Sequence, residues 1–256
     1  QALRRATGAG MMDAKKALEA NNGDPEAAAK WLRERGLAKA DKRHDRPNTE
    51  GAVAVSVTGN QAAIAELKSE TDFVAKSEPF TSLVEDIAAL VASKGEEAAR
   101  EEKAAAVDDM KLRLQENIEL GRVLRIDAAE GHVVDSYVHR QDGRGVNAVI
   151  VELDGGTAEL AHEVAVHIAF TRPAHLRRED VPADEVAEER QTLENITRAE
   201  GKPEAAMGKI LEGRLNGWFK ERVLLEQGYV KDEKQTIGQL LGDVAIVAFA
   251  QVVIGS

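Results

Sequence analysis

The sequence has no cysteine, only 4% aromatic residues and no long apolar run. Without cysteine, disulfides, thiolate catalysis and cysteine-liganded metals are excluded. No apolar run approaches the roughly 20 residues that a membrane-spanning helix needs. We also find no secretory signal, although Gln1 already lies in a predicted helix. These absences predict a cytoplasmic protein that does not enter a membrane.

The motifs of conventional active sites are missing as well. There is no Gly-Lys-Ser/Thr phosphate loop and no serine in a nucleophile elbow. Gly8-Ala9-Gly10 is half of a dinucleotide fingerprint, but Asp13 stands where the third glycine belongs. His162 and His167 are five residues apart, so on a helix they would point roughly 140° away from each other. A zinc-protease box needs histidines four apart, and we therefore expect His167 to be structural. The sequence predicts no catalytic residues, no metal and no cofactor.

Composition and charge favour a soluble globular protein. The chain has 256 residues, of which 43% are hydrophobic and 31% charged. Its net charge of −11 is unevenly spread, because residues 1–46 carry +4 and the remainder carries −15. An acidic body repels nucleic acid, so we expect no direct nucleic-acid binding, and the charge serves either a protein partner or simply solubility. The basic N-terminal part keeps nucleic acid open as an alternative.

The first 37 residues predict three short helices. Leu3 and Ala6 belong to the first helix, and residues 11–20 form the second. Asp24-Pro25 is a typical helix start, so a third helix is expected over residues 27–35, ended by Gly36. Residues 38–49 are polar and basic, which is typical of a linker.

Two rounds of strands followed by a helix come next. Alternating apolar residues predict a hairpin that turns at residues 58–60, and apolar residues at helical spacing then run from Phe80 to Val91 until Gly95. The repetition predicts an α+β fold with a duplicated core and small antiparallel sheets. Further helices are expected over residues 96–106, 108–116, 158–170 and 236–241, and further strands over residues 118–126, 133–138, 146–153 and 244–254.

A charged helical hairpin is predicted before the last helix and strand. Residues 183–199 and 204–226 are long and helical in character, and Gly201-Lys202-Pro203 joins them. Apolar residues such as Ile196 and Phe219 would face the other helix or a core.

Residues 70–76 follow an apolar strand and precede Pro79, which suits the first turn of a helix. Asp72 or Thr71 could cap that helical turn. Phe73 has two readings from the residues alone: a core residue, as most large aromatics are, or an exposed anchor for a partner.

Two motifs carry a family resemblance. Residues 71–76, Thr-Asp-Phe-Val-Ala-Lys, resemble one signature of the bacterial elongation factor Ts family. Residues 7–18, Thr-Gly-Ala-Gly-Met-Met-Asp-Ala-Lys-Lys-Ala-Leu, resemble its other signature, and the similarity extends over nearly the whole chain. The sequence departs from the family pattern at Ala14 and Ser69, where cysteine is usual, and in its more apolar last strand, residues 251–255.

The resemblance implies a fold and a domain order. The expected parts are a three-helix domain similar to ubiquitin-associated domains, a core of two subdomains, and an inserted coiled-coil hairpin of the dimerisation type. In this chain the three-helix domain with its basic linker would be residues 1–46. The two core subdomains would be residues 47–130 and residues 131–178 with 229–256, and the hairpin would be residues 179–228.

The resemblance also implies a function. Family members act as guanine-nucleotide exchange factors for elongation factor Tu, without bond-making chemistry. The turn would displace Mg²⁺ and GDP from that partner, and other residues would add contacts. The implied partner-binding residues are Thr71, Asp72, Phe73 and Val74, together with Arg4, Met11, Met12, Lys15 and His139.

Two other readings stay open. A nucleic-acid- or ribosome-binding protein would use the basic N-terminal head, with Lys39, Lys42, Arg43 and Arg46 near phosphates. A structural coiled-coil protein would use residues 183–226 to self-associate.

Overall fold

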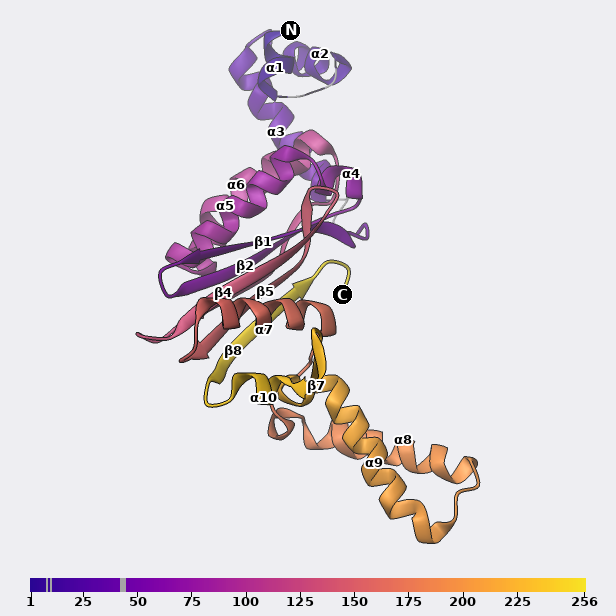
Figure 1. Ribbon diagram of the computed structural model, residues 1–256. Coiled ribbons are helices and arrows are strands. Elements are labelled where there is room, and N and C mark those ends of the chain that lie inside the picture. Colours follow the sequence, from indigo (N-terminus) through magenta and orange to yellow (C-terminus); the bar gives the residue numbers. More distant parts are fainter. Residues whose placement is uncertain (8, 10, 42–44) are drawn as a thin grey trace. The chain divides into compact units, whose positions relative to one another are not determined.

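The protein has an α+β fold of helices and small antiparallel sheets, as predicted (Figure 1). The computed structural model describes residues 1–7, 9, 11–41 and 45–256. The chain forms two compact units. Unit 1 comprises residues 1–127, 138–148 and 252–256, and unit 2 comprises residues 128–137 and 149–251.

Three helices occupy the N-terminal part of unit 1. Leu3, Ala14, Ala17 and Ala28 form a small core, against which the half-buried Trp31 packs. Such small side chains allow short helices to approach closely. The helices are α1 (Ala2–Thr7), α2 (Met11–Ala20) and α3 (Pro25–Asp41).

The third helix is longer than predicted. Asp24 caps its start, since its Oδ1 accepts hydrogen bonds from the backbone N–H groups of Glu26 and Ala27. The prediction that Gly36 ends it is wrong, because α3 continues to Asp41. An interior glycine costs only about 1 kcal/mol relative to alanine, and the neighbouring alanine, leucine, arginine and lysine residues favour helix. Lys42 and Arg43, predicted near phosphates, lie outside the described residues, as does the side chain of Lys39.

The first sheet is built around a hairpin, as predicted. Its central strand pairs antiparallel with both neighbours, in the order β1-β2-β3. Gly59 makes the hairpin turn with φ of +61°, a left-handed conformation that glycine adopts without strain. A bulge between Ala65 and Leu67 interrupts the pairing of β2 with β3. The strands are β1 (Glu50–Thr58), β2 (Gln61–Ser69) and β3 (Glu119–Asp127).

Two helices cover this sheet. Helix α5 (Glu78–Lys94) packs on β1 and β2 through the fully buried Phe80, Ile87 and Val91, and α6 (Glu96–Leu114) packs on α5 and β3 (Figure 1). We predicted two helices, over residues 96–106 and 108–116, but α6 runs through both without a break. The prediction was wrong because no glycine or proline interrupts the sequence between Gly95 and Gly121, and Asp108 and Asp109 do not by themselves end a helix.

The second sheet has the order β4-β5-β8, and helix α7 packs on its buried residues. Val149, Val151 and Leu153 of β5 are fully buried against Ile168 of α7. The predicted strands, α7 and the short helix before the last strand are all present. These elements are β4 (Val133–Gln141), β5 (Arg144–Asp154), α7 (Ala158–Thr171), β6 (Gly228–Tyr229), β7 (Asp232–Thr236), α10 (Ile237–Leu241) and β8 (Ala245–Val253).

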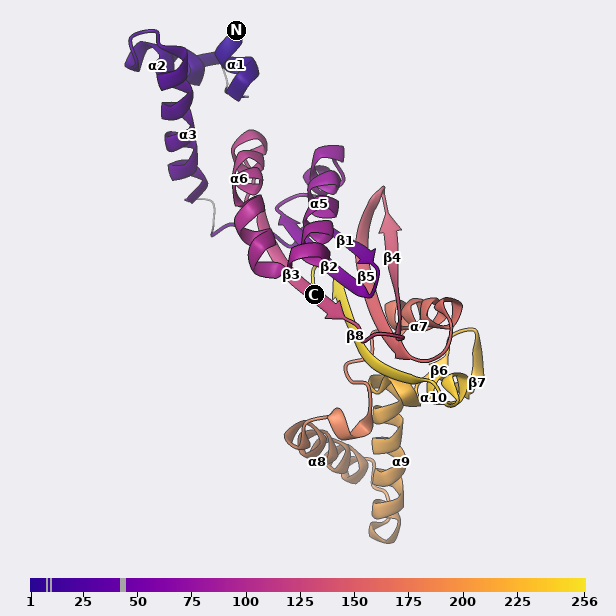
Figure 2. The ribbon, with the colours of Figure 1, turned by 90° about the vertical axis from the view of Figure 1, so that its left-hand side faces the viewer.

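The helical hairpin lies within unit 2 (Figure 2). Helix α8 (Ala183–Ala199) has the predicted bounds, whereas α9 (Glu204–Arg222) ends four residues early because residues 224–226 form a 3₁₀ turn. Phe219 is buried, as expected, and the guanidinium of Arg178 lies 4.2 Å from the centre of its ring. Ile196 is 45% exposed, so of the two alternatives for that residue the core is wrong.

No helix in the described ranges is both long enough and apolar enough to cross a membrane.

Candidate partner-binding site

A single helical turn, α4 (Asp72–Ala75), connects β2 to the long helix α5. Thr71 is its N-cap, and the Thr71 hydroxyl accepts a hydrogen bond of 3.4 Å from the backbone N–H of Val74. Of the two predicted capping residues, Thr71 therefore has the role. Ala75 is fully buried and the partly buried Val74 packs against the same core, so the turn contacts the core through these two side chains.

Phe73 is exposed. Its residue surface is 76% accessible, whereas Phe80, seven residues further on, is completely buried. The Lys76 ammonium lies 5.0 Å from the centre of the Phe73 ring, within the range of a cation–π contact. Of the two readings of Phe73, the core reading is wrong, and the turn presents a large apolar side chain to solvent.

Asp72 is held beside that ring. Its carboxylate forms an ion pair of 2.8 Å with Lys76, one turn along the chain. The hydrogen bond from Lys76, with the nearby charge of Arg144, lowers the pKa of Asp72 below its ordinary value although desolvation opposes the shift. Asp72 is thus an anion at neutral pH, next to the exposed ring.

Glu116, just after α6, contacts the backbone ahead of the turn. One of its carboxylate oxygens accepts hydrogen bonds of 3.1 Å from the backbone N–H groups of Glu70 and Thr71. The other oxygen accepts a 2.5 Å hydrogen bond from the Thr71 hydroxyl. Sequence reasoning missed Glu116, because a glutamate at the end of a charged helix gives no local sign of a partner 45 residues away.

The other predicted site residues lie on separate elements. Met11 and Met12 begin α2 and are 67% and 61% exposed, so they are not core residues. Arg4 of α1 is exposed, and Lys15 of α2 forms an exposed ion pair with Glu19 at 3.7 Å. His139 is an exposed residue near the end of β4. The structure therefore brings Thr71–Val74 together in one turn and places the remaining candidates on α1, α2 and β4.

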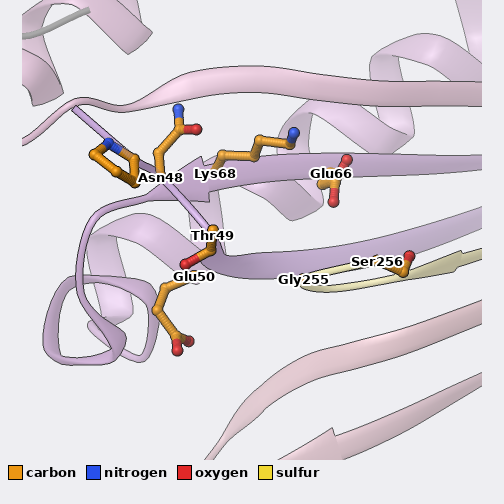
Figure 3. A pocket seen from close by; sticks show the side chains of 8 residues that line it. Asn48, Thr49, Glu50, Glu66, Lys68, Gly255 and Ser256 are labelled. Carbon is orange, nitrogen blue, oxygen red and sulfur yellow. The ribbon is translucent and has the colours of Figure 1, made fainter. Parts of the chain in front are cut away.

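A hollow in unit 1 is lined mostly by polar and charged side chains (Figure 3). Two of its carboxylates are already paired, Glu66 with Arg122 at 2.8 Å and Glu50 with Arg144 at 2.8 Å. Among the described residues, no group of three or more histidine or acidic side chains could hold a metal ion. The hollow is lined by Pro47, Asn48, Thr49, Glu50, Glu66, Lys68, Gly255 and Ser256.

His167 is a structural histidine, as predicted. It is fully buried, its Nε2 lies 3.0 Å from Oε1 of Gln227, and its Nδ1 accepts a hydrogen bond from the backbone N–H of Val230. Burial lowers the pKa of His167 below its ordinary value, so the ring is neutral at neutral pH. His162 instead pairs with Asp135 at 3.0 Å.

Comparison with known proteins gives the family. The sequence profile described as "Elongation factor TS" matches residues 70–256, which include the turn. The elongation factor Ts of Arthrobacter sp. (strain FB24) is 43% identical, over 100% of this chain and 97% of the relative. The elongation factor Ts of Deinococcus deserti is 41% identical, over 99% and 97%. The chain belongs to the elongation factor Ts family.

The structure also accommodates the departures from the elongation factor Ts pattern. Ala14 and Ser69, where the resemblance led us to expect cysteine, are buried small side chains, and the Ser69 hydroxyl donates to the carbonyl of Thr71 at 3.1 Å. In the unusually apolar last strand, Val252 is fully buried and the backbone N–H of Ile254 donates to the carbonyl of Val146. The last strand therefore keeps its contact with the core despite its sequence.

Proposed function

We propose that this protein is a guanine-nucleotide exchange factor for elongation factor Tu in translation elongation. The observation that carries the proposal is the exposed ring of Phe73 on an anchored turn, in a member of the elongation factor Ts family. Aromatic side chains are favoured anchors at protein interfaces, and this ring stands on a turn whose backbone is held in place by hydrogen bonds.

Exchange of this kind needs no bond-making chemistry. The factor binds nucleotide-free elongation factor Tu more tightly than the GDP-loaded form, and by thermodynamic linkage it weakens GDP binding by the same factor. The residues required are therefore those that bind one conformation of the partner selectively, which agrees with a site of one apolar ring and an anionic neighbour.

The proposed mechanism uses the turn as a wedge. Phe73 enters an apolar pocket between helices of the partner's GTPase domain, while Thr71 and Val74 keep the turn in shape. Asp72 holds the turn through Lys76 or accepts a hydrogen bond from the displaced helix. That displacement disturbs the residues that position Mg²⁺, so the ion and GDP leave, and the nucleotide-free partner stays bound until GTP arrives.

Further contacts come from the remaining candidates. Arg4, Met11, Met12 and Lys15 meet the nucleotide-binding domain of the partner, and His139 meets another of its domains. Methionine suits such a surface because its flexible, polarizable side chain adapts to the partner.

We propose family-like roles for the other parts too. The three N-terminal helices form a domain similar to ubiquitin-associated domains within residues 1–46, and residues 179–228 form a coiled-coil module of the dimerisation type. Residues 47–130 form one core subdomain, and residues 131–178 with 229–256 form the other. The site of action is the cytoplasm.

The test follows the release of fluorescent GDP from elongation factor Tu with and without this protein. We expect release to accelerate with protein concentration, and co-elution with nucleotide-free elongation factor Tu on a sizing column. Unchanged release would refute the proposal. Steeply salt-dependent binding to RNA in the same preparation would instead favour the nucleic-acid reading.

A further inference from the structure

The helical turn that carries Phe73 is too short to be stable alone. Helix α4 has four residues, and forming a first helical turn is unfavourable because it fixes several dihedral angles for one hydrogen bond. Residues elsewhere in the fold must therefore hold this turn.

Phe73 itself contributes little to holding the turn. Most of its surface is accessible to water, and its ring contact is with Lys76 of the same turn. Packing of the ring therefore does not determine where the ring lies. Its place is set by the backbone of residues 70–75.

Glu116 is the long-range polar anchor of that backbone. Its three hydrogen bonds fix the N–H groups of residues 70 and 71 and the Thr71 hydroxyl. Since that hydroxyl gives its proton to Glu116, its lone pairs are free to accept the N–H of Val74 across Phe73. A relay of hydrogen bonds thus runs from Glu116 through Thr71 to Val74, and hydrogen bonds to a carboxylate are about twice as strong as neutral ones.

A reciprocal contact strengthens the anchor. The Glu70 carboxylate accepts a 2.6 Å hydrogen bond from the backbone N–H of Asn117, next to Glu116. The amide of the buried Asn117 donates to the carbonyl of Arg46 at 2.9 Å, and Arg46 forms an ion pair with Glu70 at 3.5 Å. The two chain segments therefore hold each other through side-chain-to-backbone bonds in both directions.

We propose that Glu116 is a positioning residue for nucleotide exchange: its carboxylate fixes the backbone of Thr71 so that Phe73 is presented in the binding geometry before the partner arrives. This inference rests on the proposed exchange function. It assigns the presentation of the ring to a residue outside both family signatures. A ring fixed in advance loses less conformational freedom on binding, which raises the affinity of the contact.

The test is a double-mutant cycle on GDP release from elongation factor Tu. The proteins are the wild type, Glu116→Gln, Phe73→Ala and the double variant, each checked by thermal melting. Gln keeps the shape of the side chain but replaces one acceptor oxygen with a donor, so we expect stimulated release to slow about 3- to 10-fold. In the Phe73→Ala background we expect Glu116→Gln to cause no further loss, because the positioned ring is gone.

Glu66→Gln is the matched control. Like Glu116, Glu66 is a carboxylate in unit 1 that accepts hydrogen bonds from a backbone N–H and from a side chain. Both of its donors belong to Arg122, and neither belongs to the turn. We expect this control to lower the melting temperature and to keep the wild-type release rate. If Glu66→Gln slows release as much as Glu116→Gln, the effect is one of general stability and the inference is overturned.

The remaining outcomes separate the two hypotheses. If Glu116→Gln stimulates GDP release as well as the wild type does, while Phe73→Ala stimulates it poorly, the positioning role is overturned and the proposed function stands. Equal slowing by Glu116→Gln in both backgrounds overturns it as well, since the effect then does not pass through the ring. A wild-type protein that fails to stimulate release refutes the proposed function and the inference with it.

Discussion

Replacing Phe73 with alanine should separate binding from folding. The residue is 76% exposed, so folding buries only about a quarter of its surface. Full burial of a phenylalanine side chain stabilises by about 1.5–3 kcal/mol, so the variant should lose about 0.4–0.7 kcal/mol from this term. The cation–π contact with Lys76 adds about 0.5 kcal/mol at an exposed site. The free energy of unfolding should therefore fall by about 0.9–1.2 kcal/mol.

The effect on exchange should be much larger. About three quarters of the ring remains for a partner to bury, which corresponds to about 1.1–2.3 kcal/mol. If this energy is gained only with the displaced conformation of elongation factor Tu, its loss slows release by about 7- to 50-fold. The magnitude follows from the accessible fraction of the ring.

Urea denaturation and stopped-flow release of fluorescent GDP measure the two quantities. Phe80→Ala is the matched control, since the same residue type is fully buried seven positions away. We expect that control to lose about 3–5 kcal/mol of stability, as large-to-small changes in cores do.

Either of two results would refute the reasoning. Phe73→Ala could stimulate GDP release from elongation factor Tu as well as the wild type does, which would show that the ring makes no contact specific to the displaced conformation of that partner. It could also destabilise the protein as much as Phe80→Ala does, which would show that the ring is part of the core in solution.

Two further predictions concern stability. Arg122→Ala should lower the free energy of unfolding by about 2–3 kcal/mol in urea denaturation, because it removes the guanidinium from the buried Glu66 carboxylate and one hydrogen bond from the carbonyl of Val253. The backbone N–H of residue 122 still bonds Glu66, and the Arg122 side chain is 38% exposed, so the loss stays below that of breaking a fully buried pair. For His167, burial lowers the pKa in the folded state below the ordinary 6.5, so the unfolded chain binds more protons as the pH falls below that value. The melting temperature should therefore drop between about pH 7.5 and 5.5. His167→Gln, which keeps a polar group toward Gln227, should show a smaller drop. An equal drop in both proteins would contradict the assignment of this pH dependence to His167.

Local patterns predicted most elements of the fold. Apolar spacing and turn residues placed the hairpin of β1 and β2, helix α5 and the last strand, because each of these depends on residues near one another in sequence. The errors at Gly36 and in α6 have a common cause. A glycine or a pair of aspartates is a weak signal, and helix-favouring neighbours outweigh it.

The site was only partly predictable. The turn itself follows from its strand, its cap and the following Pro79, but the exposure of Phe73 does not, since most phenylalanines are buried. Glu116 could not be predicted, because its partners are the backbone N–H groups of Glu70 and Thr71, which carry no side-chain signature. Contacts from a side chain to a distant backbone leave no pattern in a single sequence.

Unit 1 is assembled from segments that lie far apart in the sequence, and this affects how the protein folds during its synthesis. This unit takes residues 252–256 from beyond the whole of unit 2, and Arg122 donates a 2.6 Å hydrogen bond to the carbonyl of Val253 in that segment. Domains generally fold during translation from the N-terminus onward. Here residues 252–256 must emerge from the ribosome before unit 1 is complete, so a nascent chain stalled before residue 252 would hold β3 without the hydrogen bond from Arg122 to Val253.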